Sequence, residues 1–317
     1  MGDQDLPACA TRGAWKGSVV TEMDIALLRR ARKISANVDC RVPGPEVVPE
    51  PVNGERVVFL AHFERGFGLP VSQFFRDFLD FFRLQPHHLG ANAVMLLSAF
   101  VTLCEGYLGV RPSIGLWRRF FHLRSFRVGN GVYVPDPKGE PGATVELKVM
   151  AECGAAIIYI NRSVTYPNPQ PPQSIKDWQL GFFYVRTSDG QEDCLNLPAF
   201  SLPPPTTKHQ WAEKPGHGDT DLDAQVDRVA KLMEIGLRSS DLVAAWICSR
   251  VLPLQRRCHR ICDMSSRRDP TRISTHRMAE DELIRRVRLQ TDAPLLLNPF
   301  KFGLKTYDRA HPPPPPV

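Results

Sequence analysis

The sequence predicts an α+β protein with a mainly helical N-terminal core, a small antiparallel sheet and a C-terminal helical segment. Three patterns predict this class. Apolar residues recur at helical spacing between positions 72 and 122, short β-branched and aromatic runs follow between 131 and 185, and a new helical pattern begins near 222. A chain of 317 residues is long enough for one large domain or two ordinary ones.

The first 55 residues are expected to hold one helix and a proline-rich spacer. Thr21 and Asp24 form a capping pattern, and Ile25 and Leu28 follow at helical spacing. Prolines are then dense from position 43 to position 51. We therefore assign residues 1–55 to an N-terminal helix and spacer that precede a main domain at 56–200.

Residues 56–125 are expected to form a compact helical core. A short strand at 56–60 leads into a glycine-rich turn at 62–70, and Ser72 is placed to cap the next helix. The side chains of that helix cover more than one face with apolar groups, which indicates burial against two neighbours: Phe74, Phe75, Phe78, Leu79, Phe81 and Phe82. Two more helices are predicted, at 92–108 and, capped by Ser113, at 114–122.

The pattern changes to strands after residue 128. Pro and Gly turns separate β-branched and aromatic runs at 131–134, 144–149, 156–160 and 181–185. We expect these runs to form one antiparallel sheet of three or four strands within 128–186. A proline-rich linker at 201–219 follows the sheet.

The last part of the chain is expected to form a helical segment at 220–290 and a tail at 291–317. Apolar residues recur at helical spacing near its start: Leu222, Val226, Val229 and Met233. Ser239 or Ser240 can cap a second, apolar helix, and a charged helix is predicted at 279–290. The tail ends in five prolines at 312–316, which predicts an extended, disordered end.

Composition and targeting signals predict a soluble intracellular protein. The chain is 43% hydrophobic and 23% charged, which excludes wholesale disorder. The N-terminus has no basic region followed by an apolar run, and the apolar stretch at 91–104 is shorter than the ~20 residues that a bilayer requires. The eight cysteines lie mostly alone, as buried apolar residues rather than disulfide partners. We expect no membrane partner, and the patterns favour neither nucleus nor cytoplasm.

The net charge of +6 is concentrated in one segment, because residues 250–277 carry eight arginines against Asp263 and Asp269. The rest of the chain therefore sums to zero. Arginine clusters can neutralise phosphates, so this segment is a candidate nucleic-acid-binding site. Its candidate residues are Arg250, Arg256, Arg257, Arg260, Arg267 and Arg268, with Arg272 and Arg277 beside them. A solvated or partner-facing basic surface is the other interpretation of this segment, and the favoured one.

Two groups of metal-ligating residue types occur, and neither has the spacing of a metal site. His62, His87 and His88 flank the helical core, but no cysteine or carboxylate lies near them at ligand spacing. Cys258 and Cys262 lack the second ligand pair that a structural zinc requires. We expect no metal and no cofactor.

The motifs that would indicate an enzyme are incomplete. The loop Gly66-Phe67-Gly68 lacks the third glycine of a dinucleotide-binding motif, because Val71 occupies that position. The sequence also lacks a Gly-x-Ser-x-Gly elbow, and Asp219-Thr220-Asp221 lacks the glycine of a retroviral-type protease. We therefore expect a protein that is not an enzyme.

Several motifs together resemble the plant gypsy-type transposon domain family. They read VVFLAHFERGFGLP at 57–70, FFRDFL at 74–79, LQPHHL at 84–89 and AFVTLCE at 99–105. The resemblance covers about residues 20–125, and the runs DLV at 241–243, PLQRR at 253–257 and DPTR at 269–272 extend it. The segment 262–268 departs from the family pattern, and with the proline-rich end it would fit a truncated or decaying copy.

The resemblance implies an origin in a retrotransposon and supplies no catalytic residues. The leading hypothesis is a non-enzymatic, element-derived protein that acts as a structural or interaction component, through self-association or contact with other element proteins. The alternative is a nucleic-acid-binding accessory protein that uses residues 250–277. An active transposase or nuclease is the weaker third hypothesis.

Overall fold

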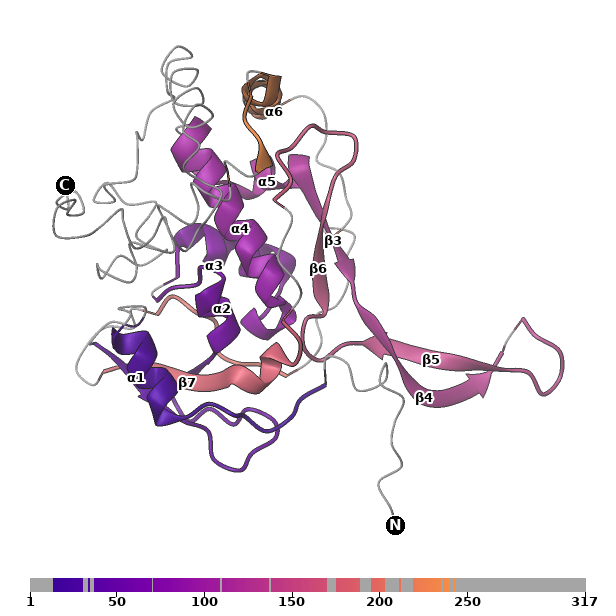
Figure 1. Ribbon diagram of the computed structural model, residues 1–317. Helices are drawn as coiled ribbons and strands as arrows, with labels where there is room; N and C mark the ends of the chain where they lie inside the picture. The colour runs from indigo at the N-terminus through magenta and orange to yellow at the C-terminus, as the bar shows by residue number, and fades with distance from the viewer. Residues whose placement is uncertain are drawn as a thin grey trace.

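A computed structural model describes residues 14–242 apart from 31–33, 35–36, 70, 109, 137, 170–174, 189–194, 203–210, 212–218, 235 and 240–241 (Figure 1). The expected helix at 279–290, the tail at 291–317 and most of the apolar helix after Ser239 lie outside these residues. Within them the α+β class is confirmed.

Six α-helices are described, and all but α2, which lies where a turn was expected, fall close to the predicted positions. They are α1 Glu22–Arg30, α2 Leu60–Glu64, α3 Gln73–Phe82, α4 Ala91–Leu103, α5 Ile114–Phe120 and α6 Thr220–Glu234. Helix α4 is shorter than expected because the chain continues as a π-helical turn at Cys104–Leu108, and α5 ends two residues early because Phe121 begins a strand.

Helix α4 runs through the middle of the molecule (Figure 1). Twelve of its 13 residues are buried, so it has no polar face to turn toward water. Helix α2 and the strand at Ala156–Ile160 contact it directly. From α3, the Phe74 ring lies 5.5 Å from that of Phe100. The helical core is therefore arranged around α4.

Serine caps start two of these helices, as the sequence predicts. The Ser72 side chain accepts a hydrogen bond of 3.1 Å from the Phe75 backbone N–H, and Ser113 accepts one of 3.2 Å from Leu116. Each cap satisfies a backbone donor that has no partner within the helix. The Thr21 cap of α1 is reciprocal: the Thr21 N–H donates to the Asp24 carboxylate over 2.8 Å, and the Asp24 N–H donates to the Thr21 hydroxyl over 3.4 Å.

The turn expected at 62–70 begins as a helix. Residues Leu60–Glu64 form α2, and the chain then reverses through Gly66, whose φ is 97°. The Phe67 N–H donates to the His62 carbonyl over 2.9 Å, and the Gly66 N–H donates to the Phe63 carbonyl over 3.4 Å. These two bonds form a Schellman motif, which favours glycine at the left-handed position.

The predicted strands belong to three small antiparallel sheets rather than to one. Strands β1 Val38–Arg41 and β2 Arg56–Phe59 both pair with β7 Phe182–Thr187. Strand β3 Phe121–Ser125 pairs with β6 Ala156–Ile160, and β4 Arg127–Pro135 pairs with β5 Thr144–Met150 in a hairpin that projects from the body (Figure 1). Strands β1 and β3 were not predicted, since β1 is short and polar and β3 continues the helical pattern of α5.

The proline-rich stretch at 43–51 is held against the sheet. Arg41 makes a bidentate ion pair with Glu55, with both N–O distances 2.7 Å, and its guanidinium lies 3.9 Å above the Tyr184 ring. The Tyr184 hydroxyl donates to Glu46 over 2.8 Å and accepts from the Glu50 N–H over 2.9 Å. The boundary proposed at residue 55 thus separates β1 from β2, although both pair with β7.

Helix α6 packs against α5. Val229 and Leu232 are buried on its inner face, and Arg119 of α5 makes an ion pair of 3.1 Å with Asp223. Over the described part of the chain, no helix has the length and apolar character needed to cross a bilayer.

We expect Gly66→Ala to lower the free energy of unfolding by about 1–2 kcal/mol, because a side chain at a left-handed position is strained. Denaturant unfolding followed by circular dichroism measures this change. Gly17→Ala is the matched control, since the nearest atom to its new methyl group would be the Glu46 carbonyl oxygen at 3.9 Å. Equal stability of the two variants would contradict the role given to Gly66.

Candidate functional site

The arginines predicted to bind nucleic acid lie outside the described residues, and so do Cys258, His259 and Cys262. The structure does place the other candidates, His62, His87 and His88, and all three are buried. The site described below is therefore the group of rings around these histidines, which we call the histidine–aromatic cluster: Trp15, Phe59, His62, His87, His88, Trp178 and Phe200.

His62 enters the cluster from α2. Its Nε2 atom lies 2.9 Å from the Leu89 carbonyl oxygen, so this nitrogen carries the proton and donates. The His62 ring stacks on Trp178, with centroids 5.1 Å apart and planes at 25°, and contacts Phe59 at 5.1 Å. The hydrogen bond from His62 to Leu89, which joins the motifs at 57–70 and 84–89, is therefore surrounded by aromatic rings.

His87 and His88 enter from a 3₁₀ turn at Pro86–His88. The His88 Nδ1 atom accepts a hydrogen bond of 2.9 Å from the Gln85 N–H, which fixes the start of the turn. The two imidazoles lie edge to face with centroids 4.1 Å apart. The proline and the short turn therefore direct both histidines toward the interior.

Tryptophan and phenylalanine from distant segments cover His87. The Trp15 ring lies 5.3 Å from the His87 ring, and the Phe200 ring lies 5.1 Å from it. The His87 carbonyl accepts a hydrogen bond of 2.8 Å from the Gly154 N–H. Within the described part of the chain, neither ring nitrogen of His87 has a hydrogen-bond partner.

Burial makes His62 and His87 neutral at physiological pH. It lowers the pKa of His62 to about 4 from its ordinary value of 6.5, and the hydrogen bond to Leu89 opposes the shift only in part. Burial also lowers the pKa of His87 well below 6.5, with the neighbouring His88 and His62 adding to the effect. A proton on either ring would be a charge inside an aromatic cluster.

The cluster has the character of a packing centre. Its ring contacts join strand β2, helix α2, the 3₁₀ turn and the segments that carry Trp15, Trp178 and Phe200. In the region that the structure describes, no group of three or more His, Cys, Asp or Glu side chains is arranged to hold a metal ion. Aromatic contacts of this kind add about 0.5–1.5 kcal/mol each beyond burial of area.

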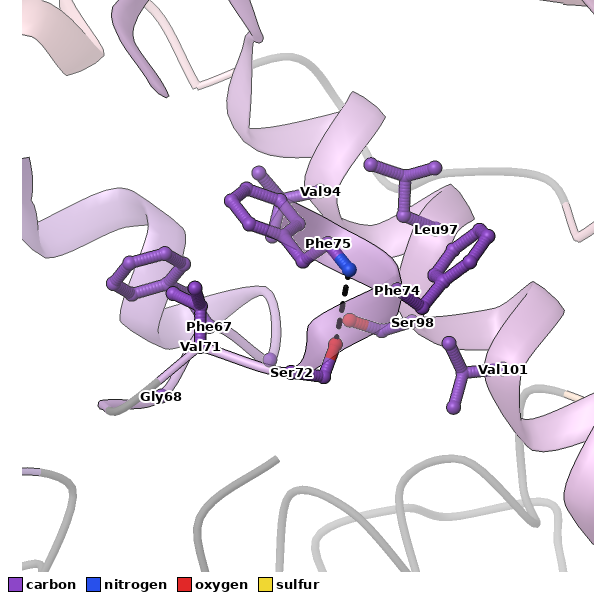
Figure 2. Close-up of a pocket in the computed structure, with 11 residues that line it drawn as sticks. Phe67, Gly68, Val71, Ser72, Phe74, Phe75, Val94, Leu97, Ser98 and Val101 are labelled. Atoms are coloured by element: carbon purple, nitrogen blue, oxygen red, sulfur yellow. Dashed lines mark hydrogen bonds between the residues drawn. The ribbon is translucent and has the colours of Figure 1, made fainter. Parts of the chain in front are cut away.

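A second feature of the same segment is a small apolar cavity between α3 and α4 (Figure 2). Its volume is about 20 Å³, room for about one water molecule. Phe67, Phe75 and Leu97 line it, and the nearby Ser72 hydroxyl is used as the α3 cap. Small-molecule sites are about 300–1,000 Å³, so this cavity is a packing gap.

The sequence contained only part of the signal for the cluster. The histidines stood out in the motifs, whereas Trp15, Trp178 and Phe200 lie in stretches without periodic patterns. Isolated large aromatics in proline- and glycine-rich loops are the signal that could have identified them, because such rings are rarely left in solvent.

The motifs at 57–105 therefore come together in one buried core, and comparison with known families bears on this segment. Residues 57–125 match a family model described as "Putative gypsy type transposon". The resemblance found in the sequence is confirmed for this gypsy-type segment. It stays a prediction for residues 20–56 and 236–272. No curated protein and no solved structure matches the chain.

The buried histidines predict a loss of stability in acid. Folding lowers the pKa values of His62 and His87, so the native state binds fewer protons than the unfolded chain. Their contribution is complete above pH 6.5 and declines as the pH falls from about 6.5 toward 4, at up to about 1.4 kcal/mol per pH unit for each histidine. Urea unfolding at pH values between 7.5 and 5 measures the slope.

Two matched variants separate the roles of the histidines. His62→Leu leaves the Leu89 carbonyl without its donor and is expected to cost about 1–3 kcal/mol at pH 7.5. His87→Leu removes a ring without hydrogen-bond partners, so it should cost less at that pH and should flatten the acid slope. A larger loss from His87→Leu than from His62→Leu would contradict this assignment.

Proposed function

We propose that this chain is a non-enzymatic protein of a gypsy-type element whose folded part serves as a scaffold for interaction. The observation that carries the proposal is that the matched motifs pack against one another in the interior. His62 of the first motif donates to Leu89 of the third, and Phe74 of the second contacts Phe100 of the fourth. These residues hold the fold together.

The buried polar groups of the gypsy-type segment support the same interpretation. The His62 Nε2 proton and the Ser72 hydroxyl are both used on backbone groups of the same segment. A general base or nucleophile has to reach a substrate, and these two groups are directed at the chain itself. Their placement favours a role in the fold, with partners bound on the surface. We propose a second copy of the chain or another protein of the element as the partner.

An assay for strand cleavage and strand transfer tests the non-enzymatic proposal. The purified full chain is incubated with labelled single- and double-stranded DNA and RNA in the presence of Mg²⁺ or Mn²⁺. We expect the substrates to remain intact. Cleavage or transfer that co-purifies with the chain and is abolished by a chelator would overturn the proposal.

The arginine-rich segment 250–277 favours a second candidate function, contact with nucleic acid. It carries the whole net charge of the chain, +6. Phosphate contacts release bound counterions, so binding through this segment would be weakened by salt and would depend little on sequence. The proposal concerns charge alone, because these residues lie outside the described part of the structure.

The triple variant Arg256→Glu, Arg257→Glu, Arg260→Glu is expected to weaken nucleic-acid binding at least tenfold and to lower the slope of log K against log salt by about three. Fluorescence anisotropy over a salt series measures both. The matched control, Arg30→Glu, Lys138→Glu, Lys176→Glu, changes the net charge equally at exposed positions. Equal binding by the two triple variants would sink the arginine-segment candidate.

A further inference from the structure

The two-stranded ribbon β3–β6 has one face in the core and one face outside. Phe121, Leu123 and Ile158 are buried, whereas Arg124 is exposed and Tyr159 is 40% exposed. The antiparallel register places His122 opposite Tyr159. His122, Arg124, Ile157 and Tyr159 therefore share the outward face, which we call the ribbon face.

Three flat groups lie together on the ribbon face. The guanidinium carbon of Arg124 lies 4.9 Å from the centroid of the Tyr159 ring. The His122 ring is nearly parallel to the Tyr159 ring, with an angle of 22° and a centroid distance of 5.8 Å. A phenol, an imidazole and a guanidinium from two neighbouring strands thus form one row at the surface.

The stretch of sequence that contains β3 carries charge of one sign. No acidic residue occurs in the sequence between Glu105 and Asp136, whereas five arginines do: Arg111, Arg118, Arg119, Arg124 and Arg127. Arg119 is neutralised by Asp223, but Arg124 and Arg127 are exposed. On the other strand, Arg162 follows β6 and is also exposed.

Three other arginines at the surface are paired with carboxylates, whereas no ion pair is described for Arg124. Arg41 pairs with Glu55, Arg76 with Asp80 and Arg186 with Asp39. Among the described residues, the contact made by Arg124 is the one with the Tyr159 ring. Its charge is therefore available to an anionic partner, beside an aromatic ring that is open to solvent.

We propose that the ribbon face binds single-stranded nucleic acid. Tyrosine and histidine rings and guanidinium planes are the groups on which unpaired bases stack, and exposed aromatics on a sheet surface serve this purpose. Arg127 and Arg162, at the ends of the row, would contact phosphates. A duplex keeps its bases stacked inside and offers them no such surface. This surface lies outside both the scaffold interior and the segment 250–277, so the inference does not rest on either.

Fluorescence anisotropy with the full chain tests the inference, using labelled oligo(U) and oligo(dT) of about 12 nucleotides and a duplex of equal length. We expect single strands to bind more tightly than the duplex. Tyr159→Ala should weaken single-strand binding about tenfold, whereas Tyr159→Phe, which keeps the ring, should bind within about twofold of the unmodified chain. Oligo(U) and oligo(dT) distinguish an RNA preference from a DNA preference.

Two further variants supply the charge test and its control. Arg124→Ala should weaken binding and lower the salt slope by about one. Arg30→Ala, at an exposed position in the last turn of α1, should leave both unchanged. Thermal melting of each variant shows whether it folds like the unmodified chain. If Tyr159→Ala does not fold, Arg124→Ala and Tyr159→Phe still test the inference.

With segment 250–277 intact, any of three results would overturn the inference: absence of single-strand binding, a duplex bound as tightly as single strands, or unchanged affinity of Tyr159→Ala and Arg124→Ala. Its failure is distinguishable from that of the arginine-segment candidate. In a chain that carries Arg256→Glu, Arg257→Glu and Arg260→Glu, Tyr159→Ala should still weaken the remaining binding. Complete loss of binding in that triple variant would assign all of it to residues 250–277 and refute the ribbon face.

Discussion

A helix that is apolar on every side has to be covered on every side, and α4 imposes this constraint on the whole protein. Burial of a large apolar side chain stabilises a fold by about 1.5–3 kcal/mol, so the seven buried Val, Met, Leu and Phe side chains of this helix are a dominant contribution. Helices α2 and α3 and strands β3 and β6 supply the cover, through contacts such as Phe74 and Phe121 with Phe100. The aromatic character of α3 follows from its place between α4 and α5.

The elements that depend on neighbours in the sequence were predictable, and those that depend on distant residues were not. The caps of α3 and α5 required only Ser72 and Ser113 and the helical pattern behind them. Strand pairing is different, because β7 can be seen as a strand but its partners cannot. The short polar β1, some 145 residues earlier, becomes a strand through pairing with β7.

The same distinction applies to the candidate sites. The histidines could be read from the motifs, but the rings that cover them could not, since Trp15 and Trp178 lie far from His87 and His62 in the sequence and far from each other. The ribbon face was hidden for another reason. His122 and Arg124 fit the end of an apolar-and-basic helix as well as a strand, and only the pairing with β6 puts them beside Tyr159. The arginines at 250–277 remain a prediction from charge.

The central place of β7 has a consequence for synthesis. Strands β1 and β2 lie on its two sides, and both leave the ribosome long before it does. The 122 residues between Phe59 and Phe182 are synthesised at about 5–20 residues per second, so the two strands wait on the order of ten seconds for their partner. Unpaired strand edges attract other chains during such an interval. From the emergence of β2 until that of β7, the nascent chain therefore carries strands without their pairing partner, and this is the stage of synthesis at which association with other chains is favoured.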